Sequence, residues 1–237
     1  MSGAVANGQS IFQVIFLPGM AARPAMWASV AKRLQADAFP SEIWEWITPV
    51  GNETIGQYSA RWVERNRGDA GGRTIVVGAS FGGIVGHEVA KLLDADALVL
   101  VGSVKTRGDL PVWMRMLSPM RWLAGLVPWR VGQWGVDQAR GIWRPFVGKD
   151  LALVIEEFVT ADPKLIGWSI KRLLAWKGDS DLLCPVTTIH GTKDRLLPMD
   201  MNQVDVVIPD GRHVLSLSHA EEIADVLQRL VLLIRVF

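Results

Sequence analysis

The chain has 237 residues, and its 25 lysines and arginines nearly balance its 24 aspartates and glutamates. A formal net charge of +1 argues against a nucleic-acid-binding protein, which would carry a strong basic excess. Hydrophobic residues make up 49% of the sequence, enough for a sizeable core, and the single cysteine, Cys184, excludes an intramolecular disulfide.

The N-terminal segment predicts neither secretion nor membrane insertion. Residues 1–9 are small and polar, which predicts a disordered tail, and no basic residue precedes the first apolar stretch, unlike in a signal peptide. No apolar run approaches the roughly 18–20 residues that a membrane span needs. We therefore expect a cytoplasmic protein.

Short apolar runs that end near glycine or proline alternate along the chain with segments of helical periodicity. The runs predict strands at Ile11–Leu17, Ile43–Ile47, Thr74–Val77, Ala97–Val101, Val186–Ile189 and Val204–Ile208. The periodic segments predict helices at Ala25–Gln35, Glu53–Asn66, Ile84–Leu93 and Glu221–Leu233. Continuous apolar strands separated by helices indicate an α/β fold, in which helices cover a mostly parallel sheet.

One long stretch, residues 104–183, interrupts this alternation. It contains no buried-strand pattern but seven of the 11 tryptophans and several prolines and methionines. Loops longer than about 15 residues without secondary structure are uncommon. The sequence therefore predicts a helical cap at 104–183, inserted into a core formed by residues 10–103 and 184–237.

The segment Gly78–Gly82 fits the pattern G-x-S-x-G between a predicted strand and a predicted helix. A strand that turns at once into a helix holds its central residue in strained geometry at the carboxyl edge of the sheet. Glycines two positions on either side allow the strand and helix to approach closely. A glycine-rich turn with an incidental serine is the alternative, but the context favours Ser80 as a nucleophile.

A serine nucleophile needs a general base and an acid that orients the base. Asp194 follows the predicted strand 186–189, and His213 follows the strand 204–208. Both positions, like that of Ser80, lie where parallel strands end, at the edge of the sheet that carries sites in open α/β folds. The sequence therefore predicts a catalytic triad of Ser80, Asp194 and His213.

Three other histidines compete for the role of base. His87 lies inside the helix that follows Ser80, and His190 lies at a strand end, where a structural hydrogen bond is expected. His219 comes six residues after His213 but directly precedes the last helix, with Ser218 a candidate N-cap. Loop position favours His213 over His219.

An oxyanion hole requires two backbone N–H donors. The residue after the nucleophile, Phe81, is expected to supply one donor. The loop after the first strand, Leu17–Met20, is expected to supply the other through Met20, because Gly19 lets the backbone turn.

From about Ile11 to its C-terminus the chain resembles the α/β-hydrolase superfamily, specifically its capped, esterase-like members with a serine nucleophile. The motifs that carry the resemblance are Leu17–Met20, with Pro18 where the family usually has histidine, Gly78–Gly82, Gly191–Asp194 and Gly211–His213, with Arg212 in place of glycine. The family's first two strands have no counterpart. The resemblance therefore implies an α/β-hydrolase fold with a sheet of about six strands.

The resemblance also implies a reaction. Ser80 would attack the carbonyl of a small-molecule carboxylic ester, and water would then hydrolyse the acyl-enzyme, with neither metal nor organic cofactor. Thioesterase, lactonase and C–C hydrolase reactions use the same triad, and a non-catalytic binding protein with this fold is a further alternative. An apolar acyl or alcohol group is expected.

Two features of the predicted cap bear on its ligands. Trp113, Met116 and Trp122 are candidates for substrate binding, although such side chains more often form a cap's own core. Between Lys105 and Lys149 there are eight basic and two acidic residues. This excess indicates either a solvated face or a site for an acidic partner, such as a carrier protein or a lipid headgroup.

Overall fold

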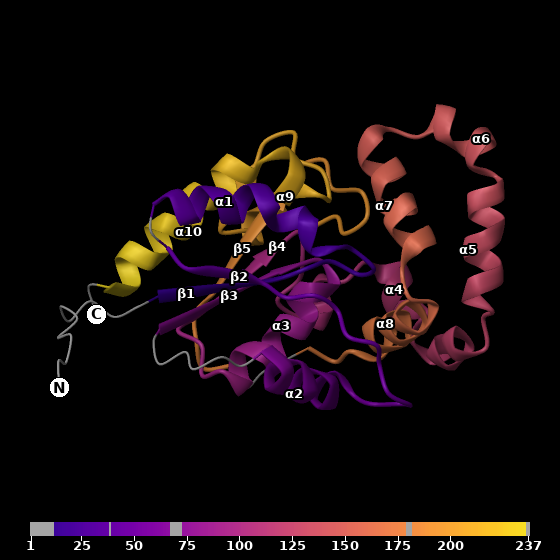
Figure 1. Ribbon diagram of the computed structural model, residues 1–237, viewed down its shortest axis with the longest axis horizontal. Helices are drawn as coiled ribbons and strands as arrows, with labels where there is room; N and C mark the ends of the chain where they lie inside the picture. Colours follow the sequence, from indigo (N-terminus) through magenta and orange to yellow (C-terminus); the bar gives the residue numbers. More distant parts are fainter. Residues whose placement is uncertain (1–11, 38, 67–72, 179–181, 236–237) are drawn as a thin grey trace, which may run out of the picture.

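A computed structural model describes residues 12–37, 39–66, 73–178 and 182–235 of the chain. Its centre is a six-stranded sheet with the order β2-β1-β3-β4-β5-β6, in which every neighbouring pair is parallel (Figure 1). The strands are β1 (Phe12–Leu17), β2 (Ser41–Ile43), β3 (Arg73–Ala79), β4 (Ala97–Val101), β5 (Val186–Gly191) and β6 (Val206–Ile208). The expectation of an α/β fold with about six strands is confirmed. The tail predicted at residues 1–9 lies outside the described residues.

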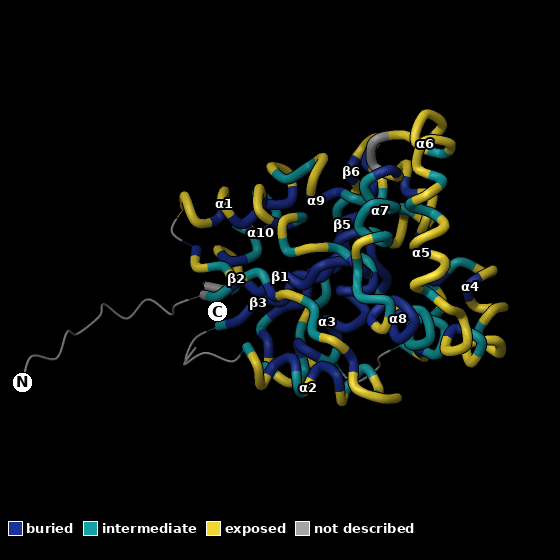
Figure 2. The backbone as a smooth tube through the Cα atoms, turned by 45° about the vertical axis from the view of Figure 1, so that its right-hand side comes forward, coloured by how far each residue is buried: buried dark blue, intermediate teal, exposed yellow. Residues whose placement is uncertain are grey.

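Helices cover both faces of the sheet. Figure 1 shows α1 (Ala28–Ala36), α9 (Leu215–Ser218) and α10 (Ala220–Arg235) on one face, and α2 (Ile55–Asn66) and α3 (Phe81–Leu92) on the other. Each layer encloses its own cluster of buried apolar side chains. Strands β3 and β4 are buried almost throughout, which explains why their sequences are continuous apolar runs rather than alternating ones (Figure 2).

The second strand differs from its prediction at 43–47. Strand β2 covers Ser41–Ile43, and the chain then leaves the sheet after one further hydrogen bond, from Trp44 N–H to Phe16 O at 3.0 Å. Residues 44–47 include two tryptophans that pack against α2, with Trp46 stacked on Trp62 at 4.6 Å between ring centroids. The apolar run marks burial against a helix rather than membership of the sheet.

The segment between β4 and β5, here called the β4–β5 segment, contains only helices and turns in its described residues. These helices are η2 (Arg107–Asp109), α4 (Val112–Met116), η3 (Ser118–Gly125), α5 (Trp129–Gln138), α6 (Arg140–Trp143), η4 (Arg144–Phe146), α7 (Lys149–Thr160) and α8 (Pro163–Ala175). They gather at the end of the molecule opposite the last turns of α10 (Figure 1). Two short 3-10 helices elsewhere are η1 (Pro24–Trp27) and η5 (Met201–Gln203).

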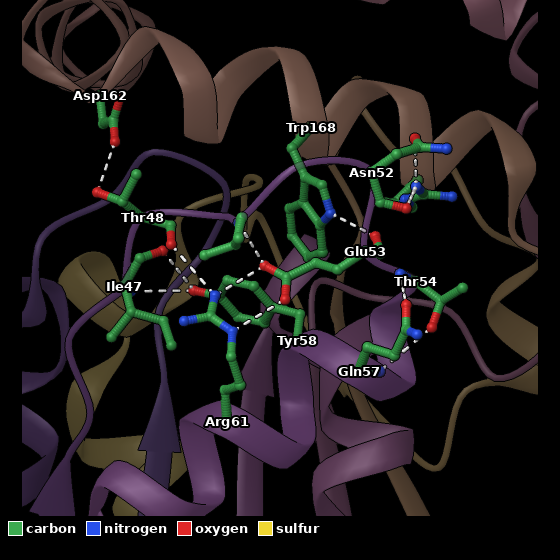
Figure 3. A network of polar contacts seen from close by, with 12 residues as sticks. Ile47, Thr48, Asn52, Glu53, Thr54, Gln57, Tyr58, Arg61, Asp162 and Trp168 are labelled. Carbon is green, nitrogen blue, oxygen red and sulfur yellow. Dashed lines mark hydrogen bonds and ion pairs between the residues drawn. The ribbon is translucent and has the colours of Figure 1, made fainter.

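Helix α8 is fixed to the core by the polar network that Figure 3 shows. Trp168 donates its indole N–H to Glu53 O at 2.8 Å, and Asp162 accepts a hydrogen bond from the Thr48 hydroxyl at 2.8 Å. Burial opposes ionisation of Glu53, but two hydrogen bonds from Arg61, at 2.7 and 2.9 Å, help to hold its pKa below its usual value. The ionised pair therefore stiffens the loop on which α8 rests.

No helix in the described ranges has both the length and the apolar character that crossing a bilayer requires.

Candidate active site

Ser80 occupies the sharp turn between β3 and α3. Its backbone has φ 49° and ψ −122°, a conformation that residues other than glycine rarely adopt. Two neighbours hold it there: Ser80 N–H donates to Val101 O at 3.0 Å, and the buried Ser103 hydroxyl donates to Ser80 O at 2.7 Å. Nothing in the sequence had singled out Ser103.

The close approach expected around this turn is visible at Gly82. A Cβ added to Gly82 would lie 2.2 Å from Pro18 O, well inside the distance that real Cβ atoms show. The start of α3 is thus pressed against the loop that follows β1. Glycine at this position is what lets that loop and Ser80 share one corner of the sheet.

Asp194 lies in the loop after β5, with a residue exposure of only 6%. Its Oδ1 accepts backbone N–H bonds from Leu196 at 2.9 Å and Leu197 at 3.0 Å. Its Oδ2 lies 2.8 Å from His213 Nδ1 and 3.2 Å from His190 Nε2. Burial alone would raise the pKa of this carboxyl, but hydrogen bonds from the two histidines and the backbone hold the pKa well below its usual value. Asp194 is therefore an ionised, immobile acceptor.

His213 connects this carboxylate to the serine. Because a carboxylate only accepts, the short contact assigns the proton to His213 Nδ1. The Nε2 lone pair then faces the Ser80 hydroxyl, with Nε2 3.0 Å from Oγ. Ser80, His213 and Asp194 thus form a continuous hydrogen-bonded chain, built from loops at the ends of β3, β5 and β6.

The loops that carry the acid and the base are pinned to each other. Thr192 N–H donates to Ile208 O at 3.1 Å, and Lys193 N–H donates to Gly211 O at 2.8 Å. A Cβ on Gly191 would lie 2.2 Å from Gly211 O, so glycine is required for this contact as well. The distance between the acid and the base is set by backbone, not by flexible side chains.

His190 is fully buried beside the acid and extends the chain by one residue. Its Nε2 lies 2.8 Å from Leu197 O and 3.2 Å from Asp194 Oδ2. Both of these atoms only accept, so His190 Nε2 carries the proton and donates to them. The other ring nitrogen, Nδ1, is buried and has no hydrogen-bond partner among the described residues. The structural hydrogen bond expected of His190 is present, and it reaches the acid itself.

The remaining histidines lie apart from this chain. His219 is bonded to the exposed Ser218 hydroxyl, with Nδ1 2.8 Å from Oγ. His87 is buried in α3 beside the Trp176 ring, at 5.7 Å between ring centroids. The structure therefore places His213, and neither of these two, against Ser80.

The two residues expected to form an oxyanion hole, Met20 and Phe81, belong to segments that lie next to Ser80. Phe81 begins α3, where the first N–H groups of a helix have no partner within it. The loop that carries Met20 is adjacent, since a Cβ on Gly19 would lie 3.7 Å from Ser80 Cβ. Ala21 has φ 61°, so this loop too is held in a conformation that a non-glycine residue rarely adopts.

Aromatic side chains pack against Phe81, the residue that follows Ser80. Phe81 stacks on Trp46, with ring centroids 6.0 Å apart, and meets Trp168 of α8 edge-on at 5.8 Å. Trp46 also donates its indole N–H to Gly19 O at 2.8 Å, which ties it to the Met20 loop. The sequence does not indicate Trp46 as a site residue, because the apolar run at 43–47 predicts a strand.

The three residues singled out from the sequence as candidates for substrate binding do not belong to the buried cluster around Phe81. Trp113, Met116 and Trp122 are 53%, 73% and 58% exposed. Trp168 and Met114, by contrast, belong to the buried cluster that includes Phe81. Within the β4–β5 segment, Trp168 is therefore buried in the core, whereas Trp113 and Trp122 are exposed to solvent.

A second contact joins the β4–β5 segment to the Met20 loop. Arg23 donates its backbone N–H to Glu157 Oε2 at 3.0 Å and its side-chain Nε to the same oxygen at 3.3 Å. Glu157 belongs to α7, so α7 and α8 both contact the loops around Ser80. In the part of the chain that the structure describes, no three histidine, cysteine or acidic side chains gather as metal ligands would.

A parallel sheet with a serine, a histidine and an acid at its carboxyl edge is the arrangement of an α/β-hydrolase. The chain belongs to the alpha/beta hydrolase family, whose sequence model matches residues 14–226. A comparison with curated protein sequences finds no significant match.

Solved structures share this fold at low identity. A thermophilic esterase from Thermogutta terrifontis superposes with a TM-score of 0.68 at 17% identity, over 94% of this chain and 90% of that one. Carboxylesterases from Nitrososphaera gargenis give 0.64 at 17% identity, with 96% and 92% covered. An enol-lactonase from Burkholderia xenovorans gives 0.62 at 17% identity, with 92% and 90% covered. At this identity, the similarity establishes the fold alone.

Proposed function

We propose that the protein is a serine hydrolase that cleaves carboxylic esters through an acyl-enzyme. The observation that carries the proposal is the hydrogen-bonded chain from Ser80 Oγ through His213 to Asp194, with contacts of 3.0 and 2.8 Å. Such a chain lets the imidazole take the serine proton while the buried carboxylate stabilises the imidazolium that forms.

Each residue has a role in two half-reactions. In the first, His213 removes the Ser80 proton, Oγ attacks the ester carbonyl, and His213 returns the proton to the departing alkoxide. In the second, His213 deprotonates a water molecule that attacks the acyl-enzyme, and Ser80 leaves with that proton. The N–H groups of Met20 and Phe81 hold the oxyanion in both steps. The reaction needs neither a metal nor an organic cofactor.

The substrate is a small ester with an apolar acyl or alcohol group. The support is an aromatic cluster of Trp46, Phe81 and Trp168, which packs around the residue that directly follows the nucleophile. In this proposal residues 104–183 act as a cap, since Glu157 and Trp168 bring α7 and α8 against the loops around Ser80.

The test is hydrolysis of p-nitrophenyl esters with acyl chains from C2 to C12. Wild type, Ser80→Ala and His213→Ala are compared, and His219→Ala is the matched control because His219 is bonded to Ser218 instead. Activity should vanish in the first two variants and remain in the control, with circular dichroism spectra unchanged. Loss of activity in the control but not in His213→Ala would refute the assignment of the base.

The bond that is cleaved can be tested in the same assay. Thioesters and lactones of matched chain length, offered beside the esters, would rank the three classes by kcat/KM. Two expectations from the sequence, an acidic carrier protein as partner and a cytoplasmic location, stay predictions.

A further inference from the structure

The outer side of the β4–β5 segment is unusually apolar for a surface. Among the described residues, 13 of the 21 exposed large hydrophobic side chains lie between Val112 and Leu151. Six of them define what we call the outer surface, and they are 53–86% exposed: Trp113, Met116, Trp122, Trp134, Ile142 and Phe146. A concentration of large exposed apolar side chains in one segment is a feature of interaction sites.

Helix α5 illustrates how this surface is built. Its inner side packs against α7 and α8, and the buried Gln133 amide donates there to Phe158 O at 2.7 Å and Ala161 O at 2.8 Å. Arg130 and Trp134, four residues apart on the same helix, are both exposed. In Figure 2 the helices α4, α5 and α6 follow one another along this exposed end of the molecule.

The segment that carries the outer surface is rich in arginine, although Asp109 and Asp200 line one pocket with Trp113, Arg115 and Met116. Between Val112 and Phe146 there are five arginines, at 115, 121, 130, 140 and 144, and a single acid, Asp137. Arg140 lies 3.8 Å from Asp137, and Arg144 pairs with Glu156. Arg115 and Arg130 are exposed and form no ion pair within the described ranges. The surface therefore offers unpaired guanidinium groups among tryptophan and aliphatic side chains.

The combination of apolar side chains and unpaired arginines favours some binding partners of the outer surface over others. A second copy of the chain, docked about a two-fold axis, would bring the exposed Arg115 and Arg130 of both copies to one interface. An anionic bilayer matches both properties, because apolar side chains enter the acyl boundary while arginines meet lipid phosphates. Tryptophan is also the residue enriched at the membrane–water interface.

We propose that the outer surface binds the surface of an anionic phospholipid bilayer, so that the protein is peripherally membrane-associated. Binding requires no chemistry at Ser80, so the proposal stands or fails independently of the proposed reaction. Each arginine near an anionic surface is expected to strengthen partitioning about fivefold.

The test is flotation with two kinds of vesicle, phosphatidylcholine alone and phosphatidylcholine with about 30% phosphatidylglycerol. Wild type should float with the anionic vesicles and remain largely unbound to the neutral ones. Arg115→Glu/Arg130→Glu should weaken binding at least 25-fold, and Trp122→Ser/Trp134→Ser/Phe146→Ser at least tenfold. The control is Leu232→Ser/Leu233→Ser, because these side chains are 55% and 59% exposed on α10, away from the outer surface.

Three results would overturn the proposal. The first is failure of the wild type to float with anionic vesicles. The second is an equal loss of binding in the α10 control. The third is a dimer, detected by light scattering, that Trp122→Ser/Trp134→Ser/Phe146→Ser dissociates, since a second copy would then cover the outer surface. Ester hydrolysis in solution, measured on Arg115→Glu/Arg130→Glu, should stay within twofold of wild type.

Discussion

His190→Leu is expected to lower kcat for ester hydrolysis while leaving KM nearly unchanged, and His190→Gln is expected to restore most of the loss. The reason lies in the second histidine contact to the acid. His190 Nε2–H donates to Asp194 Oδ2 at 3.2 Å and to Leu197 O at 2.8 Å. Leucine fills the space but offers no donor, whereas the glutamine amide reaches about as far as imidazole Nε2 and supplies an N–H.

The magnitude follows from the type of bond that is lost. A hydrogen bond to a charged group contributes about 1.5–3 kcal/mol. The contact to Asp194 is long and shared with a carbonyl, which places it near the lower end, at about 1.5–2 kcal/mol. If the whole of this free energy stabilises the transition state, its loss lowers kcat by roughly 10–30-fold.

The assay is steady-state hydrolysis of one p-nitrophenyl ester across pH 5–9, with thermal unfolding measured on the same preparations. A positioning role predicts that kcat falls with KM fixed and that glutamine rescues it. Wild-type kcat in a folded His190→Leu protein would refute the reasoning. So would equal losses in the leucine and glutamine variants with matched midpoints of unfolding.

Three further predictions concern the turn at Ser80 and the acid. Gly82→Ala should reduce activity at least 100-fold, because the new Cβ would lie 2.2 Å from Pro18 O and displace the loop that carries Met20. Gly132→Ala, with open space around its Cβ, should not reduce it. Unchanged activity in Gly82→Ala would contradict this. Ser80→Gly should be more stable than Ser80→Ala by about 1 kcal/mol in urea denaturation, since only glycine relieves the strain at φ 49°, and a less stable Ser80→Gly would disprove it. The depressed pKa of Asp194 contributes stability that is present above the unfolded value near pH 4 and lost as pH falls below it, so Asp194→Asn should flatten urea stability between pH 5 and 2. The same dependence of urea stability on pH in wild type and Asp194→Asn would contradict the depressed pKa of Asp194.

The positions of the site residues could be predicted because they follow strand ends. The runs before Ser80, Asp194 and His213 became β3, β5 and β6, and parallel strands bring their carboxyl ends to one edge. The loops after β3, β5 and β6 then place Ser80, Asp194 and His213 close to one another. The choice of His213 over His219 depended in addition on its position in a loop rather than beside the last helix.

Other features depended on packing that periodicity does not encode. The run at 43–47 is apolar because Trp44 and Trp46 pack on α2, not because it forms a strand. In the β4–β5 segment, the tryptophan pattern could not tell that Trp168 faces the core while Trp122 faces solvent. Short, irregular helices have no sustained 3.6-residue stripe, so their buried side is set by neighbours distant in sequence.

The most direct test of the central claim is covalent labelling with a fluorophosphonate, read by peptide mass spectrometry. If Ser80 is the nucleophile and His213 its base, wild type gains one adduct on the peptide that contains Ser80. Ser80→Ala then gains none, His213→Ala is labelled at least 100-fold more slowly, and His219→Ala is labelled at the wild-type rate. An unlabelled wild type, or an adduct on any other serine, would contradict the account.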